Sequence, residues 1–167
     1  MQRIAVFAGS FDPLTVGHLD IVRRASALFD EVWVLLAVNA SKRYMFSDEA
    51  RLEMVRKSVA QFSNVKADRF DGLTVDFAKR VGAKYLVRGI RNAADVDYEQ
   101  TVAWNNKMLC LECETVFLSS ALEHLMVSST VVRELLKAGV TATGEGRELL
   151  AKYVPEQILP ILLKENS

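Results

Sequence analysis

The chain has 167 residues, of which half are hydrophobic and a quarter are charged, a balance typical of soluble globular proteins. This length predicts one domain, residues 1–167, with a substantial core. Lysine plus arginine and aspartate plus glutamate both number 21, so the formal net charge is zero. This balance argues against nucleic acid or an anionic membrane as a partner.

The apolar stretches are too short to cross a membrane. The longest one near the middle of the chain, residues 32–38, falls far below the roughly 20 residues that a spanning helix needs. Near the N-terminus, residues 4–8 are apolar, but Gly9 and Ser10 follow, which makes the segment a poor signal peptide. The sequence therefore predicts a cytoplasmic protein.

Short, continuous apolar runs indicate the strands. They occupy residues 4–8, 32–38, 85–87 and 115–118. Continuous rather than alternating apolarity is typical of strands that are covered on both faces, as they are in a parallel sheet.

Amphipathic stretches predict the helices, at residues 19–29, 48–62, 93–109, 131–137 and 145–164. Ser47 is the expected N-cap of the second helix, and Gly139 is expected to follow the fourth. Pro155 and Pro160 should bend or break the last helix. Strands and helices that alternate in one domain predict a doubly wound α/β fold with a parallel sheet. Ligands in such folds bind beyond the carboxyl ends of the strands.

The first candidate loop, residues 9–18, follows the first predicted strand. Gly9 allows a tight turn off the strand, and Asp12 and Pro13 continue the turn. Gly17 permits a close approach of backbone and ligand. His18 lies at the start of a helix, where free amides and the positive end of the dipole attract phosphate. The alternative is a structural turn with a helix-capping histidine.

The second candidate loop contains Arg88, Gly89 and Arg91 after the third predicted strand. The two arginines present forked donors that suit phosphate, on either side of a residue without a side chain. For an isolated pair, a solvated surface position would be the better interpretation.

The third candidate loop contains Ser128, Ser129 and Thr130 at the start of a predicted helix. Their hydroxyls could do no more than cap that helix. With the free amides of the first turn, they could also hold the β- and γ-phosphates of a nucleotide.

These three loops carry a family resemblance that covers essentially the whole chain. The string GSFDPLTVGH at 9–18 is similar to the T/H-x-G-H signature of the nucleotidyltransferase superfamily, and to the opening of the bacterial phosphopantetheine adenylyltransferases. The string RGIR at 88–91 resembles the family's R-G-L-R, with Tyr98 and Glu99 at the matching distance. Residues 127–130 resemble the family's I-S-S-S/T. Two departures are Ser10, where threonine is common, and His124, where tryptophan or tyrosine is frequent.

The resemblance implies a Rossmann-like nucleotidyltransferase that transfers the adenylyl group of ATP to 4′-phosphopantetheine, giving dephospho-coenzyme A and pyrophosphate. It implies catalytic roles for His18, Lys42 and Arg91. It places around ATP Ser10, Phe11, His18, Gly89, Ile90, Arg91, Glu99, His124, Val127, Ser128, Ser129 and Thr130. It places at the second substrate Ser10, Lys42, Thr74 and Arg88. It further implies Mg²⁺ carried in with ATP rather than held by protein ligands, and a homo-oligomer, by resemblance a hexamer.

Two alternatives to this function stay open. One is another small-molecule nucleotidyltransferase, such as a nicotinamide mononucleotide adenylyltransferase or a cytidylyltransferase, which shares the first loop but usually differs over residues 88–99. The other is a catalytically idle nucleotide sensor. Intact His18, Lys42, Arg88 and Arg91 argue against a sensor.

Cys110 and Cys113 have C-x-x-C spacing, which suggests a zinc or redox site. A closed zinc site needs four ligands, and the chain has no other cysteine and only two histidines. The pair also ends a predicted helix, whereas redox pairs normally begin one. We therefore predict buried structural cysteines and no disulfide framework, and we interpret Trp33 and Trp104 as packing residues.

Overall fold

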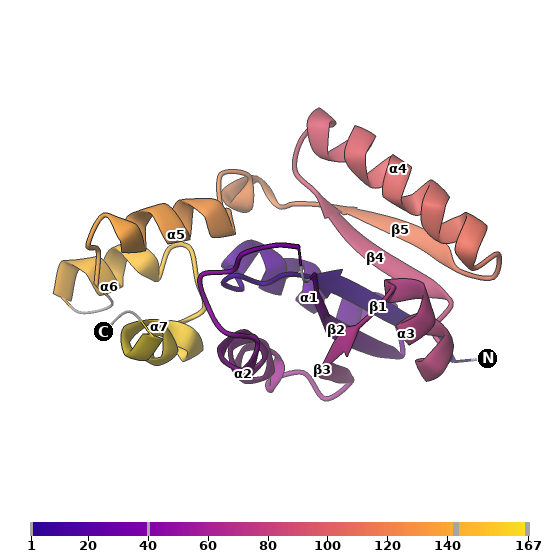
Figure 1. Ribbon diagram of the computed structural model, residues 1–167, viewed down its shortest axis with the longest axis horizontal. Coiled ribbons are helices and arrows are strands. Elements are labelled where there is room, and N and C mark those ends of the chain that lie inside the picture. The colour runs from indigo at the N-terminus through magenta and orange to yellow at the C-terminus, as the bar shows by residue number, and fades with distance from the viewer. Residues whose placement is uncertain (1, 40, 142–143, 166–167) are drawn as a thin grey trace.

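The structure, a computed structural model, describes residues 2–39, 41–141 and 144–165. At its centre lies a sheet of parallel strands in the order β3-β2-β1-β4-β5 (Figure 1). The strands are β1 (Ile4–Gly9), β2 (Glu31–Val38), β3 (Val65–Asp71), β4 (Tyr85–Ile90) and β5 (Glu114–Ser119). The predicted α/β fold with a parallel sheet is confirmed. Because the strand order reverses between β1 and β4, a crevice opens beyond the carboxyl ends of these two strands.

The first four helices alternate with the strands, and the last three follow β5. The helices are α1 (Val16–Leu28), α2 (Asp48–Val59), α3 (Thr74–Val81), α4 (Ala93–Leu109), α5 (Ser129–Lys137), α6 (Gly144–Leu150) and α7 (Leu159–Glu165), with 3₁₀ turns at Leu122–His124 and Glu156–Ile158. The Ser47 hydroxyl accepts a hydrogen bond from Ala50 N at 3.1 Å, which confirms the predicted cap of α2. Gly139 follows α5 with a φ of 86°, a conformation that glycine adopts readily. Pro160 lies in the first turn of α7, where its missing N–H is tolerated.

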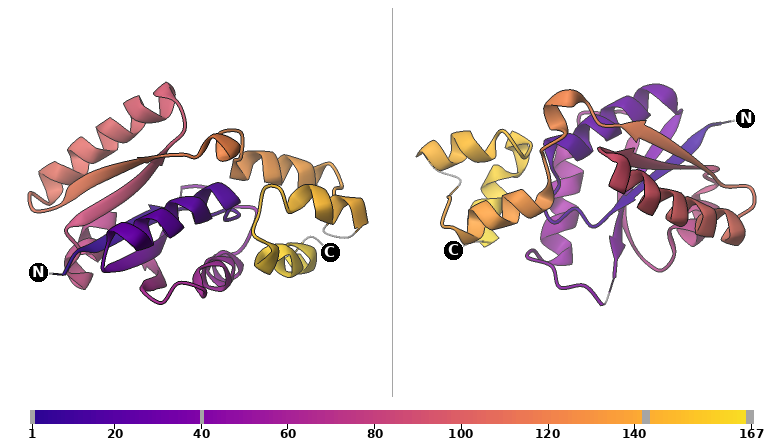
Figure 2. Two further views of the ribbon diagram at one scale, coloured as in Figure 1. Left: turned by 180° about the vertical axis from the view of Figure 1, so that it is seen from behind. Right: turned by 90° about the horizontal axis from the view of Figure 1, so that it is seen from above.

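The two faces of the sheet are covered by different helices (Figure 2). Phe7 and Val34 pack with α1 and α2 on one face, whereas their neighbours Val6 and Leu35 pack with α3 on the other. The right-handed crossover from β4 to β5 places α4 on the face of α3. Strands that are buried on both faces explain the continuous apolar runs in the sequence.

After β5 the chain leaves the sheet, and α5, α6 and α7 gather at one end of the molecule, with α7 beside α2 (Figure 1). Their buried residues form one cluster with those of α2, namely Phe46, Ala50, Met54, Val132, Leu136, Leu150, Val154, Ile158, Leu159, Ile161 and Leu162. Each large aliphatic side chain buried here contributes about 1.5–3 kcal/mol to folding. The cluster therefore ties α5, and the hydroxyl residues at its start, to the C-terminal elements that pack against α2.

Strand β3 is missing from the strands that the sequence predicts. Within the described part of the chain it pairs with β2 alone, at the edge of the sheet, and its residues are half-buried or exposed. An edge strand needs no continuous apolar run, because one of its sides and much of one face remain in water. That is why its sequence carries little apolar signal.

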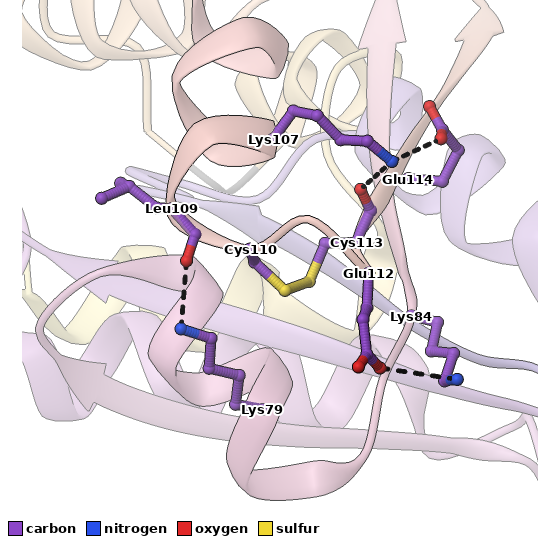
Figure 3. The surroundings of a disulfide bond; sticks show 8 residues. All are labelled: Lys79, Lys84, Lys107, Leu109, Cys110, Glu112, Cys113 and Glu114. Carbon is purple, nitrogen blue, oxygen red and sulfur yellow. Dashed lines mark hydrogen bonds and ion pairs between the residues drawn. A yellow bond between two sulfur atoms is a disulfide. The ribbon is translucent and has the colours of Figure 1, made fainter.

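Cys110 and Cys113 form a disulfide just after α4 (Figure 3), which corrects the prediction that they do not form a disulfide framework. Their burial is confirmed, with exposed fractions of 7% and 3%. The helix ends at Cys110, and Cys113 N donates to the Cys110 carbonyl at 2.9 Å. This local turn brings the two Cα atoms to 5.3 Å, a normal separation for a disulfide. C-x-x-C spacing also fits zinc and redox sites, and no local pattern shows that this pair closes a structural loop instead.

The two tryptophans differ. Trp33 packs edge-on against Phe77 with ring centroids 5.6 Å apart, as predicted. Trp104 on α4 is 65% exposed. The prediction that it packs in the core of this chain is therefore wrong. The reason is that α4 packs against β4 and β5 with one side, and its other side exposes Tyr98, Trp104 and Met108.

Among the residues that the structure describes, no helix is both long and apolar enough to cross a membrane.

Candidate active site

A cleft of about 470 Å³ lies at the carboxyl ends of β1 and β4, where the strand order reverses. Three segments line it: the loop after β1 with α1, the end of β4 with α4, and the segment that leads into α5. The lining residues are Phe7, Ala8, Gly9, Phe11, Thr15, Gly17, His18, Ile21, Arg88, Gly89, Arg91, Asp95, Glu99, Ser120, His124, Val127, Ser128, Ser129 and Thr130. All three candidate loops of the sequence thus meet in one cavity.

The turn after β1 is built around the ring of Phe11. This residue is 2% exposed and adopts a φ of 45°, in the left-handed region. A Cβ atom added to Gly9 would lie 2.9 Å from the Phe11 ring, so the ring requires glycine there. The ring also stands edge-on to that of His18, with centroids 5.2 Å apart. Gly9 makes room for the Phe11 ring, and this ring in turn positions the imidazole of His18.

His18 occupies the third position of α1 and forms a reciprocal capping box with Thr15. Thr15 N donates to His18 Nδ1 at 3.1 Å, and the Thr15 hydroxyl accepts from His18 N at 3.3 Å. A backbone N–H can only donate, so Nδ1 is an acceptor and the ring hydrogen of neutral His18 is on Nε2. The capping role and a role toward a ligand are therefore compatible, because they use different ring nitrogens.

The imidazole of His18 is neutral at physiological pH. Burial, followed by the positive charges of Arg91 and Arg88, lowers its pKa from 6.5 to about 4. Neutral His18 presents one N–H donor without adding a charge.

Arg88 is held by a bidentate ion pair. Its Nε and Nη2 donate to the carboxylate of Glu99 on α4 at 2.5 and 2.6 Å, and Nη1 donates to the Ala8 carbonyl at 3.0 Å. Glu99 is only 8% exposed. Because a guanidinium has five N–H donors and three are used here, two remain for a ligand. The pair orients Arg88 at the junction of β1 and β4.

Arg91 lies at the mouth of the cleft. Its backbone N and side-chain Nε both donate to Oδ2 of Asp95, at 2.9 and 3.0 Å. Burial alone would raise the pKa of Asp95, but the hydrogen bonds from Arg91 outweigh it and lower that pKa. Arg91 is thus anchored to the first turn of α4, and its side chain remains 40% exposed.

The hydroxyl residues before α5 have separate structural roles. Ser128 caps the helix by accepting from Val131 N at 3.2 Å. The Ser129 hydroxyl donates to the Pro13 carbonyl at 2.8 Å, and Thr130 accepts from Arg133 at 3.1 Å. The first amides of α5 have no partner within the helix, so this end of the cleft attracts an anion.

Eleven of the predicted site residues line the cleft, and Ser10, Lys42, Thr74 and Ile90 do not. The Ser10 carbonyl accepts from Arg51, and Ile90 ends β4. Lys42 lies on the loop after β2, and Thr74 begins α3 after β3. Both follow carboxyl ends of strands, so they share the edge of the sheet with the cleft without reaching its wall.

The cleft also contains residues beyond the predicted site, among them Thr15, Asp95 and Ser120. Thr15 could have been recognised, because a threonine three residues before a polar side chain at a helix start is the pattern of a capping box. Asp95 lies four residues after Arg91, a spacing that favours ion pairs. No local pattern indicates Ser120.

Taken together, the cleft combines a neutral imidazole, two arginines and the start of a helix. These groups donate hydrogen bonds and carry positive charge, and its two carboxylates are paired with the arginines. Such a site suits a polyphosphate.

Comparison with known proteins places the chain. The cytidylyltransferase-like family model matches residues 6–135. The phosphopantetheine adenylyltransferase of Dictyoglomus turgidum is 46% identical over 154 residues, covering 92% of this chain and 94% of that protein. The phosphopantetheine adenylyltransferase of Leptospira biflexa is 42% identical over 167 residues, covering 100% and 99%.

A solved structure shares the fold. Plasmodium falciparum nicotinic acid mononucleotide adenylyltransferase complexed with NaAD gives a TM-score of 0.70 at 17% identity, covering 99% of this chain and 97% of that one. At this identity the likeness concerns the fold alone, whereas the relatives above match in sequence along nearly their whole length. The chain therefore belongs to the cytidylyltransferase-like family and, within it, to the phosphopantetheine adenylyltransferases.

Proposed function

We propose that this protein transfers the adenylyl group of ATP to 4′-phosphopantetheine, releasing pyrophosphate and forming dephospho-coenzyme A in coenzyme A biosynthesis. The observation that carries the proposal is the meeting of His18, the Arg88–Glu99 pair and the start of α5 in one cleft. Relatives that bear the name phosphopantetheine adenylyltransferase are 39–48% identical over most of the chain.

The reaction needs no protein nucleophile. The phosphate of 4′-phosphopantetheine attacks the α-phosphorus of ATP in line, a P–O bond forms, and the bond to the leaving pyrophosphate breaks. The protein has to bring two anions together and to stabilise the charge that grows on the α-phosphate.

His18 is suited to the α-phosphate. Its Nδ1 is occupied by Thr15 N, so its Nε2–H is the donor available to a ligand. Its lowered pKa keeps it neutral, so it donates a hydrogen bond without requiring a proton from solvent. A donor whose bond strengthens as charge develops contributes to the transition state more than to binding.

The other proposed contacts divide between the two substrates. Arg88 and Lys42, with Ser10, would hold the attacking phosphate, and Thr74 would contact the pantetheine arm. Arg91 and the start of α5 would hold the leaving pyrophosphate, supported by the anchoring of Arg91 on Asp95. The remaining ATP contacts proposed are Phe11, Gly89, Ile90, Glu99, His124, Val127, Ser128, Ser129 and Thr130.

Mg²⁺ is proposed to enter with ATP, whose oxygens it would bridge while neutralising their charge. The two carboxylates that line the cleft, Asp95 and Glu99, are both ion-paired with arginines. This pairing supports a metal held chiefly by phosphate oxygens and water.

A screen of acceptors tests the substrate. With ATP and Mg²⁺, pyrophosphate should appear with 4′-phosphopantetheine, and not with nicotinamide mononucleotide, nicotinic acid mononucleotide or glycerol phosphate. Replacing ATP by CTP should abolish release. A preference for a mononucleotide acceptor would overturn the assignment, and nucleotide binding without release for any acceptor would favour an idle sensor.

A homo-oligomer in the cytoplasm is also proposed, with the hexamer implied by family resemblance. In support, α4 exposes the large apolar side chains of Tyr98, Trp104 and Met108. Sedimentation at micromolar concentration should give six times the mass of 18.7 kDa. A monomer would contradict the assembly and leave the chemistry standing.

A further inference from the structure

Asp12 is a buried carboxylate that the proposed reaction does not use. It is 6% exposed and lies in the turn between β1 and α1, three residues after the end of β1. Its sequence context, before Pro13, suggested only a turn residue. Its contacts in the structure reach well beyond that turn.

The side chain of Asp12 holds the loop between β2 and α2. Oδ2 accepts from Met45 N at 2.9 Å, and Oδ1 accepts from Phe46 N at 3.0 Å. Two consecutive amides thus bind the two oxygens of one carboxylate, more than thirty residues away in the chain. A charged acceptor makes these bonds stronger than neutral ones.

A second set of contacts holds the start of the same loop, at Asn39. Asn39 N donates to the Tyr44 hydroxyl at 3.2 Å, and the Tyr44 ring lies 3.7 Å from the guanidinium carbon of Arg51. Arg51 is fully buried and donates to the Ser10 carbonyl at 2.7 Å. Lys42 lies between Asn39 and Met45, the two points at which the loop is held, and its backbone N donates to the Asn39 carbonyl at 3.0 Å.

Asp12 is also tied to the start of α5. Arg133 donates to the Asp12 carbonyl at 2.6 Å, and its Nη1 lies 3.9 Å from the Asp12 carboxylate. The same arginine donates to Thr130. One residue therefore joins the turn after β1, the loop that carries Lys42 and the helix that is suited to pyrophosphate.

We infer that Asp12 is a positioning residue that sets Lys42 relative to the His18 turn, acting through the amides of Met45 and Phe46. This inference rests on the proposed function, in which Lys42 holds the attacking phosphate. A small displacement of such a group can slow a reaction about a hundredfold.

Asp12→Asn tests the inference, because asparagine keeps the size but has one acceptor oxygen where two are needed. The variant should lower kcat/KM for 4′-phosphopantetheine by about ten- to a hundredfold, and leave KM for ATP within about threefold. A merely structural residue would lower the melting temperature without separating the two substrates. Asp30→Asn is the matched control: Asp30 accepts from Arg3 N at 2.7 Å, and it lies at the amino-terminal edge of the sheet.

A double-mutant cycle with Lys42→Ala tests whether Asp12 acts on the reaction through Lys42. If Asp12 acts through Lys42, Asp12→Asn should cost less than about threefold when Lys42 is already alanine. An equal loss in both backgrounds would overturn the inference and leave the proposed function intact. Normal turnover of Lys42→Ala itself would instead remove the proposed role of Lys42, and the inference with it.

Tyr44→Phe decides the matter if Asp12→Asn does not fold. It removes only the hydroxyl that accepts from Asn39 N and so holds the start of the loop. It should lower kcat/KM for 4′-phosphopantetheine a few-fold, again only while Lys42 is present. An unchanged kcat/KM would show that the fastening of this loop does not matter for the reaction, and would overturn the inference.

Discussion

The backbone N–H of Thr15 donates to Nδ1 of His18 across one turn of α1, at 3.1 Å. This bond sets the tautomer of the imidazole and leaves Nε2 as its donor. The same pair caps the helix, so a substitution of either residue tests whether His18 serves stability, catalysis or both.

His18→Ala should reduce kcat at least about a hundredfold while ATP binding is largely kept, because the lost hydrogen bond is strongest in the transition state. Thr15→Ala is the matched variant. It removes the cap hydroxyl and keeps the imidazole, so it should cost about 1 kcal/mol of unfolding free energy with a smaller loss of rate. Measuring kcat, ATP affinity and melting temperature on both proteins separates the roles. A destabilised His18→Ala protein with near-normal kcat would rule out catalysis by His18.

The protonation of His18 should occur near pH 4 rather than 6.5. NMR titration of the imidazole signals gives the midpoint, and the spectrum of His18→Ala assigns them. Between roughly pH 6.5 and 4 the unfolded chain binds this proton and the folded chain does not, so the free energy of unfolding should fall as the pH drops through that window. Urea unfolding at several pH values should show a shallower fall for His18→Ala. A midpoint near 6.5 would contradict the lowering of the His18 pKa by its surroundings.

Glu99→Gln should weaken both stability and substrate binding. Two short hydrogen bonds join Arg88 to the Glu99 carboxylate, and an amide can accept only one of them. The substitution therefore leaves the guanidinium of Arg88 partly unpaired in a mostly buried position. We expect a loss of about 1–3 kcal/mol in unfolding free energy and a higher KM for 4′-phosphopantetheine. Glu114→Gln is the control, since it breaks an exposed pair with Lys107 and should cost under about 1 kcal/mol. Equal losses of unfolding free energy for the two variants would contradict a larger contribution from the buried Arg88–Glu99 pair.

Replacing Cys110 and Cys113 together by alanine should leave turnover within a few-fold. The disulfide lies between α4 and β5 (Figure 3). It is therefore at the amino-terminal end of β5, whereas the cleft lies at the carboxyl ends of β1 and β4. Opening so short a loop should cost up to about 2 kcal/mol of unfolding free energy. Chemical denaturation with and without a reductant measures this loss in the unaltered protein. Stoichiometric zinc in the purified protein would contradict a purely structural role.

The amino-acid pattern alone predicts the layers of the molecule and its three candidate loops. Runs that are apolar at every position, such as residues 32–38, can be satisfied only where both faces of a strand are covered, and this requirement predicts a parallel sheet. The bounds of α4 agree with the prediction, and the cap at Ser47 was evident. Glycine, histidine, arginine and hydroxyl residues at strand ends indicated three candidate loops, because ligands bind at strand ends in doubly wound folds. These residues alone left a structural interpretation open for each loop, and the family resemblance favoured a site.

Other features required the tertiary structure, because they depend on contacts between distant parts of the chain. β3 is a strand only because β2 offers it an edge to pair with, and Trp104 is exposed because α4 packs against β4 and β5 with its other side. The anchoring of Asp12 on Met45 and Phe46 joins segments that no local spacing relates. Local patterns report which backbone states and which burial a residue prefers. Which partner satisfies a buried carboxylate or guanidinium is decided only when the chain has closed around it.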